Sequence, residues 1–204
     1  NSVYRIGSIS KTFTSVLVMK ALEEKKLNLG QTIETYFPTI KNAEKITIKH
    51  LLTHRSGIHN FTDDKDYLTW NTQSRTEKEM VEIITKAGND FEPGTKAEYS
   101  NSNFVLLSYI LEKTFHQSYA DLLQKYIVQP VGLKNTRLGG KINSEKGECK
   151  SYSFMGNWNV VPETDMSVPT GAGGIVSTPV DLVKFSNALF GGKLVKPETL
   201  EMMK

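Results

Sequence analysis

One stretch, ISKTFTSVLVMKAL at residues 9–22, constrains the fold of this chain more than any other. Its apolar residues recur on every side of a helix rather than along one stripe, which indicates a helix buried inside the protein. Lys11 lies within this stretch, and a buried lysine is costly unless polar partners surround it. We therefore expect a packed helix with Ser8 at its first turn, after the flexible Gly7, and with Lys11 one turn later on the same side.

Ser8 and Lys11 form a Ser-x-x-Lys pair, which predicts nucleophilic chemistry. Serine is a poor nucleophile until a base accepts its proton, and burial lowers the pKa of a lysine toward that of a neutral, basic amine. The unpaired N–H groups at a helix start also favour developing negative charge. The alternative is a surface lysine that extends its amine to water beside a serine that only caps the helix.

The composition bounds the remaining possibilities. The 204 residues fit one domain or two closely packed subdomains, and the net charge of +3 is spread along the chain. No basic run or basic-aromatic patch suggests nucleic acid, and no apolar run is long enough to span a bilayer. The single cysteine, Cys149, cannot form an internal disulfide.

Most of the chain is predicted to be helical. Thr76 with Glu79 forms a capping box and Gly88 a stop signal, while Thr178 followed by Pro179 is typical of another helix start. Strand signals are scarce and concentrate in residues 149–162, and a glycine loop follows at 171–174. The predicted helices span residues 9–22, 47–57, 77–87, 103–115, 118–129 and 179–190.

A second group of polar side chains comes much later, in EPGTKAEYSNSNF. Tyr99 and Asn101 are predicted to lie in a loop just before the apolar helix that begins near Asn103. A loop braced by a buried helix can hold side chains over a cleft. The alternative is that Ser100, Asn101 or Ser102 caps the helix.

Three histidines, His50, His54 and His59, lie close together in the sequence. His50 and His54 could share a helix face, so a metal site is conceivable. No His-Glu-x-x-His pattern and no nearby carboxylate ligand accompany them, and we predict neither a metal nor a cofactor.

GSISKTF, with Ser8 and Lys11, followed by YSN, with Tyr99 and Asn101, closely resembles the penicillin-recognising serine hydrolases. These are the class C β-lactamases, the serine D-alanyl-D-alanine peptidases and related esterases. The resemblance runs from residue 4 to about residue 190 and implies an α+β fold of the β-lactamase/transpeptidase type. The flanking segments that also resemble the family, in its order, are ITIKHLLTHRSGI, FEPGTKAEYSNSNFVLLSYILEK, QPVGLKNT and GAGGIVSTPVDLVKF.

This resemblance implies a role for each residue. Ser8 would be the nucleophile that forms an acyl-enzyme, and Lys11 the amine that helps take its proton. Tyr99 would shuttle that proton to the leaving group, and Asn101 would bind the substrate amide. We expect Lys11 and Tyr99 each to lower the pKa of the other. The backbone N–H of Ser8 would supply half of an oxyanion hole.

The family's third motif, a Lys or His, then Ser or Thr, then Gly on a strand, has no match in its expected place. RSG at residues 55–57 precedes Tyr99 and is explained better as the segment between the first two motifs. We therefore expect residues 1–204 to be a single partial catalytic domain, truncated at both ends. Much of the antiparallel sheet would lie outside it, and this segment alone would be inactive.

The resemblance implies a serine hydrolase that acts on an amide or ester: a D-Ala-D-Ala peptide, a β-lactam or a small ester. The peptidase and esterase branches are favoured, because Gly173 stands where class C β-lactamases carry a bulky aromatic residue. The alternative is a sensor that binds penicillin or wall peptide and acylates slowly or not at all. A periplasmic or extracellular location is implied, with a small molecule or peptide as partner; the oligomeric state stays open.

Overall fold

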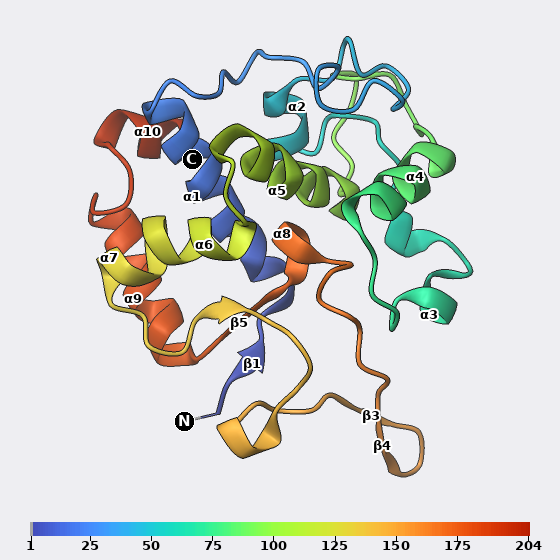
Figure 1. The fold of residues 1–204 in the computed structure, drawn as a ribbon, viewed down its shortest axis with the longest axis vertical. Helices are drawn as coiled ribbons and strands as arrows, with labels where there is room; N and C mark the ends of the chain where they lie inside the picture. The colour runs from blue at the N-terminus through green and yellow to red at the C-terminus, as the bar shows by residue number, and fades with distance from the viewer. Residues whose placement is uncertain (1) are drawn as a thin grey trace.

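A computed structural model of the chain describes residues 2–204 (Figure 1). The helices are α1 (Ser10–Glu23), α2 (Ile48–Leu52), α3 (Tyr67–Trp70), α4 (Glu77–Ala87), α5 (Asn101–Phe115), α6 (Tyr119–Leu123), α7 (Gln129–Val131), α8 (Thr170–Gly173), α9 (Pro179–Phe190) and α10 (Pro197–Met202). The strands are β1 (Tyr4–Arg5), β2 (Arg137–Leu138), β3 (Tyr152–Phe154), β4 (Trp158–Val160) and β5 (Ile175–Ser177). Within residues 2–204, no helix combines the length and the apolar character needed to cross a bilayer.

A small antiparallel sheet leads into α1. β5 is its central strand, flanked by β1 and β2, and Val176 of β5 pairs with Arg5 on one side and Arg137 on the other. A separate hairpin of β3 and β4 projects from the lower end of the molecule in Figure 1. The result is the mostly helical α+β architecture that the sequence predicts.

The core forms around α1, which packs against α5, α6 and α8 (Figure 1). The ring of Phe13 stacks on that of Phe185 in α9, with centroids 3.8 Å apart. α8 approaches α5 closely because Gly171 has no side chain: a Cβ there would lie 2.8 Å from the Cβ of Ser108 and 2.9 Å from the carbonyl oxygen of Phe104. This close approach brings the backbone of α8 to the side of α1 that carries Lys11.

The starts of two helices differ from the predictions. Gly7–Ile9 form a 3₁₀ turn, a common prelude to an α-helix, so Ser8 lies in the turn before α1 rather than in its first turn. α5 begins at Asn101 rather than near Asn103. The side chain of Asn60 accepts a 2.9 Å hydrogen bond from the backbone N–H of Asn101, and this tertiary contact stabilises an earlier start.

Two helix ends also differ. α2 starts after Thr47 as predicted, but it stops at Leu52 because His54 adopts a left-handed φ of 55° that a helix cannot continue. Further along, the predicted end before Pro130 is wrong. A π-helical segment, Gln124–Val128, follows α6 without a break, and α7 carries the helix one residue past Pro130, to Val131.

The capping signals are confirmed. Thr76 and Glu79 make both hydrogen bonds of a capping box at the start of α4, and Gly88 ends that helix with a φ of 79°. The hydroxyl of Thr178 accepts from the N–H of Asp181 at the start of α9. The predicted strand region forms the β3–β4 hairpin, whereas β5, between the glycine loop and α9, was not predicted.

We expect Gly57→Ala to destabilise the intact protein by about 2–4 kcal/mol. Gly57 has a φ of +80°, and a Cβ there would overlap the carbonyl oxygen of Phe91. Gly132→Ala is the matched control, since Gly132 also has a positive φ of 70° but open space around its Cβ, so that only about 1–2 kcal/mol is expected. The free energy of unfolding, measured with urea, checks this; equal losses in the two variants would contradict it.

Candidate active site

Ser8 lies at the surface in the turn between β1 and α1, where a substrate can reach its hydroxyl. Its Oγ is 2.6 Å from the phenol oxygen of Tyr99 and 3.1 Å from the amine of Lys11. The predicted neighbours of Ser8 are therefore both within hydrogen-bond distance, although Tyr99 is 91 positions away in the chain.

Lys11 is 7% exposed and is held by oxygen atoms from three elements. Its Nζ lies 2.8 Å from Oδ1 of Asn101 and 2.7 Å from the carbonyl oxygen of Ala172, in addition to the contact with Ser8. The oxygens of Asn101 and Ala172 can only accept hydrogen bonds. As an ammonium, Lys11 can donate to all three oxygens; as a neutral amine it has two N–H bonds for the acceptors of Asn101 and Ala172 and one lone pair left for the hydroxyl of Ser8.

The electrostatics of Lys11 match the expectation in part. Burial lowers the pKa of Lys11 below the ordinary lysine value, as predicted. Tyr99 has the opposite effect, because its hydrogen bonding and charge raise the pKa of Lys11. The expectation that Tyr99 would lower the pKa of Lys11 is therefore wrong: a phenolate beside an ammonium stabilises the charged amine, and burial supplies the depression.

Tyr99 is 48% exposed and lies over Lys11, whose Nζ is 4.8 Å from the centre of the phenol ring. The ring of His54 lies against that of Tyr99, with centroids 4.7 Å apart. Burial and the nearby charge of Lys11 both lower the pKa of His54, and its Nδ1 accepts the backbone N–H of Ser100 at 3.2 Å. A neutral imidazole thus supports the tyrosine without adding a second positive charge.

Asn101 is the first residue of α5, not a loop residue as predicted. Its amide nitrogen donates to Oδ1 of Asn60 at 3.2 Å and to Oγ1 of Thr62 at 3.1 Å. Its Oδ1 consequently faces Lys11. The alternative interpretation of this segment, a helix cap by its own side chains, does not hold for Ser100, which makes no capping hydrogen bond; the side chain of Asn60 accepts from the N–H of Asn101 instead.

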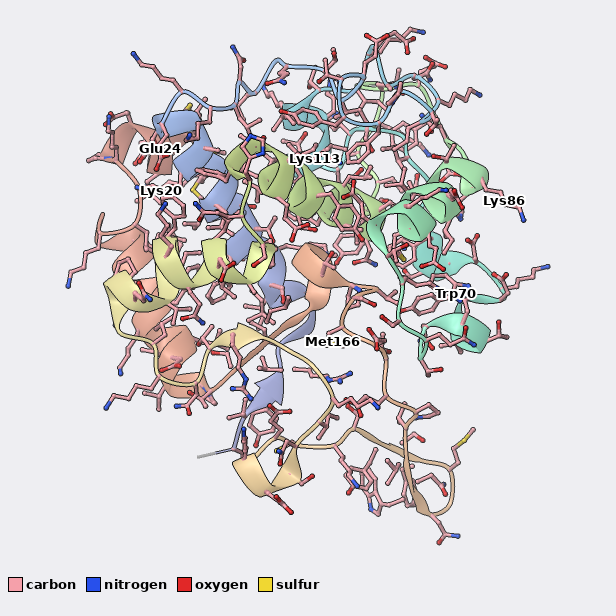
Figure 2. The ribbon with its side chains drawn as sticks, in the orientation of Figure 1. Lys20, Glu24, Trp70, Lys86, Lys113 and Met166 are labelled. Carbon is pink, nitrogen blue, oxygen red and sulfur yellow. The ribbon has the colours of Figure 1, made fainter. Side chains whose placement is uncertain are left out.

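A cleft of about 620 Å³ opens beside Ser8. Met166, labelled in Figure 2 on the segment that leads into α8, is one of its lining residues. Three charged residues line it: Arg5 and Glu163, which form an ion pair with each other, and Lys150. Gly173 borders the cleft near Ser8, so this part of the wall carries no side chain. The apolar and aromatic residues that line the cleft are Phe61, Tyr67, Ile142, Val160, Val161, Pro162, Met166, Pro169 and Ala172.

The three histidines have separate partners. Nδ1 of His50 accepts the backbone N–H of Thr47, and His59 lies between the carboxylates of Asp64 and Asp90. Of the three, His54 contacts the cluster formed by Ser8, Lys11, Tyr99 and Asn101, through the ring of Tyr99. Residues 2–204 contain no group of three or more His, Cys, Asp or Glu side chains arranged to hold a metal ion.

RSG at residues 55–57 has a structural place. The hydroxyl of Ser56 is buried and donates to Oδ1 of Asn103 at 2.6 Å. This contact ties the segment between the two motifs to α5. Ser56 is therefore engaged in the interior, in keeping with the sequence interpretation that this triplet is not the third motif.

Sequence reasoning missed three groups that contact the predicted residues: the carbonyl of Ala172, the ring of His54 and the side chain of Asn60. A backbone carbonyl has no sequence signature. His54 has one sequence signal, its place in the segment between the motifs, although the sequence pattern points to it only as a metal ligand.

The fold and site define an α+β protein of the β-lactamase/transpeptidase-like class, and the comparisons with known proteins identify its family. The chain belongs to the beta-lactamase family, whose model matches residues 1–204. Its structure is similar to that of a D-stereospecific amidohydrolase from Streptomyces sp., with a TM-score of 0.88 and 28% identity over 98% of this chain and 64% of the other. A D-amino acid amidase from Ochrobactrum anthropi SV3 gives a TM-score of 0.85 and 29% identity, with 98% and 59% covered.

A protein related in sequence also bears the name of a hydrolase. The teichoic acid D-alanine hydrolase of Staphylococcus aureus (strain MRSA252) is 27% identical over 97% of this chain and 48% of its own length. The chain spans about half the length of the curated relatives it matches. The expectation that residues 1–204 are one part of a larger catalytic domain, inactive by itself, stays a prediction.

Proposed function

We propose that this chain carries the nucleophile and proton-transfer groups of a serine hydrolase that cleaves amides or esters through an acyl-enzyme. The observation that carries the proposal is the arrangement of Lys11, buried, with two acceptor-only oxygens on its N–H bonds and the hydroxyl of Ser8 at 3.1 Å. A lysine held only by surface water would not be positioned to take a serine proton.

The proposed reaction has two halves. Oγ of Ser8 attacks the carbonyl carbon while its proton passes to Lys11, directly or through the phenol of Tyr99 at 2.6 Å. The tetrahedral intermediate then breaks its bond to the leaving nitrogen or oxygen, which takes a proton from Tyr99, and Lys11 passes the serine proton on to Tyr99. Water attacks the resulting ester of Ser8 and gives a proton to Lys11 or Tyr99. The bond to Oγ of Ser8 then breaks, the same groups return this proton to Oγ, and the acid is released.

We further propose that the substrate is a small amide or ester of a D-amino acid, rather than a β-lactam turned over rapidly. Two similar proteins bear names that refer to D-amino acid derivatives, the D-amino acid amidase and the teichoic acid D-alanine hydrolase, and a third is named a D-stereospecific amidohydrolase. Gly173, which borders the cleft, leaves open the wall that an aromatic residue would close. Asn101 lies at the cleft and is proposed to bind the substrate amide by exchanging its hydrogen bond to Thr62 for one to the substrate. A periplasmic or extracellular location is proposed on the family resemblance.

A substrate panel on the intact protein tests this proposal. We expect D-alanine amide and D-alanine methyl ester to be hydrolysed with a kcat/KM at least about tenfold above that of a cephalosporin, a difference of roughly 1.4 kcal/mol. The L-alanine compounds are the matched controls and should be poorer substrates.

A cephalosporin that is cleaved more than about tenfold faster than the ester would instead identify a β-lactamase. Covalent labelling by penicillin without turnover of any amide or ester would identify the sensor alternative. Either result would overturn the substrate proposal.

A further inference from the structure

We infer that Asn60 is a positioning residue for acyl transfer: it fixes the amide orientation of Asn101, and through it the orientation of the amine of Lys11. The inference rests on the proposed function. Asn60 itself contacts neither Ser8 nor Lys11 by a hydrogen bond, so its effect must pass through Asn101.

Asn60 is 8% exposed and lies just before the 3₁₀ turn Phe61–Asp63. Its Oδ1 accepts two hydrogen bonds from the same neighbour, one from the backbone N–H of Asn101 at 2.9 Å and one from its side-chain amide at 3.2 Å. A single oxygen thus holds both the start of α5 and the side chain of its first residue.

The side-chain amide of Asn101 is held in one orientation by its hydrogen-bond partners. With Thr62 as the other acceptor, both N–H bonds of this amide are taken on one side. Rotation of the amide by 180° would place its two donors against the amine of Lys11, and its oxygen against the oxygen of Asn60. In one contact two donors would then face each other, and in the other two acceptors, so neither could form a hydrogen bond. Asn60 and Lys11 therefore enforce the same orientation from opposite ends.

The orientation of the Asn101 amide in turn positions the amine of Lys11. Oδ1 of Asn101 takes one N–H of Lys11 at 2.8 Å, and the carbonyl of Ala172 takes another. Without the contact to Asn101, the amine can rotate, and its lone pair is no longer confined to the direction of Ser8. Loss of the acceptor on Asn60 is thus expected to slow acylation even when the protein stays folded.

Two substitutions of similar size separate this role from stability. Asn60→Leu removes the acceptor, whereas Asn60→Asp keeps it and adds a negative charge on the far side of Asn101. We expect Asn60→Leu to lower the rate constant of acylation by about 10- to 100-fold, measured with a penicillin label and normalised to the labelled sites. Asn60→Asp should recover most of that rate when the two variants are compared on the pH plateau above the acid limb.

The pH profile supplies a readout that a purely structural role would not change. The titratable groups that face Lys11 are Tyr99 and His54. An added carboxylate favours the charged amine, so the acid limb of kcat/KM in Asn60→Asp should move to higher pH. Thr76→Ala, which removes the cap of α4 away from the site, should lower the melting temperature and leave both rate and profile unchanged.

The outcomes are distinct. Wild-type protein that is not acylated at all would overturn the proposed function. Acylation of the wild type together with an unchanged rate and pH profile in both Asn60 variants would overturn this inference alone, and so would an Asn60→Leu loss that Asn60→Asp does not recover.

Discussion

The Ser8→Ala variant of the intact protein is expected to lose covalent labelling completely and to hydrolyse the best substrate about 10⁴- to 10⁶-fold more slowly. Ser8 is the exposed hydroxyl that contacts both Lys11 and Tyr99, so no neighbouring group can take over its bond to the substrate carbonyl. Intact-protein mass spectrometry after reaction with a penicillin or an acyl phosphonate measures the label, and steady-state kinetics measures turnover.

Ser15→Ala is the matched control. Ser15 lies on the same helix as Lys11 but has no hydrogen bond to the cluster, so this variant should label as the wild type does. A label on another serine, or undiminished turnover in Ser8→Ala, would refute the assignment of the nucleophile.

Lys11→Met should slow acylation by about 10²- to 10⁴-fold while leaving the hydroxyl of Ser8 in place. Methionine fills most of the volume of lysine but cannot accept a proton, and the oxygens of Asn101 and Ala172 lose their donor. The single-turnover rate of acylation is the measurement. Lys20→Met, which changes a lysine near the other end of α1 (Figure 2), is the matched control and should acylate normally.

Lys11 should also make stability depend on pH in a defined direction. Burial lowers the folded-state pKa of Lys11, so between that pKa and 10.5 the unfolded chain binds more protons than the folded one. Stability should therefore rise as the pH increases through this window, and Lys11→Met should remove that rise. Urea unfolding of both proteins from neutral to alkaline pH measures it, and parallel curves would show that Lys11 keeps an ordinary pKa.

Local sequence was enough to predict most of the helices. The capping box of Thr76 and Glu79 and the Thr178–Pro179 start are satisfied by residues within one turn, so their effect does not depend on the rest of the fold. The predictions failed where a distant group intervened. Asn60 moves the start of α5 to Asn101, and the left-handed His54 ends α2 early.

In the candidate site, too, some features follow from local sequence and others depend on distant contacts. The apolar surroundings of Lys11 in the sequence already indicated burial and a lowered pKa, because a lysine inside an apolar helix has few ways to reach water. The sequence motifs also identified Tyr99 and Asn101. Nothing in either motif, however, shows how far Tyr99 and Asn101 lie from Lys11 in space. Their contact with Lys11 depends on α5 packing against α1.

By itself, the sequence determined the chemical groups of this protein: a serine and a lysine three residues apart at the start of a buried helix, and a Tyr-x-Asn triplet at the start of another. Only the tertiary structure decided what each group contacts. The glycine at 171 lets α8 come close enough to α5 for the carbonyl of Ala172 to reach Lys11, and Asn60 turns the amide of Asn101 toward the same amine. The physical reason is that a hydrogen bond requires two atoms within about 3 Å, and for residues far apart in the chain that distance is set by helix packing rather than by sequence spacing.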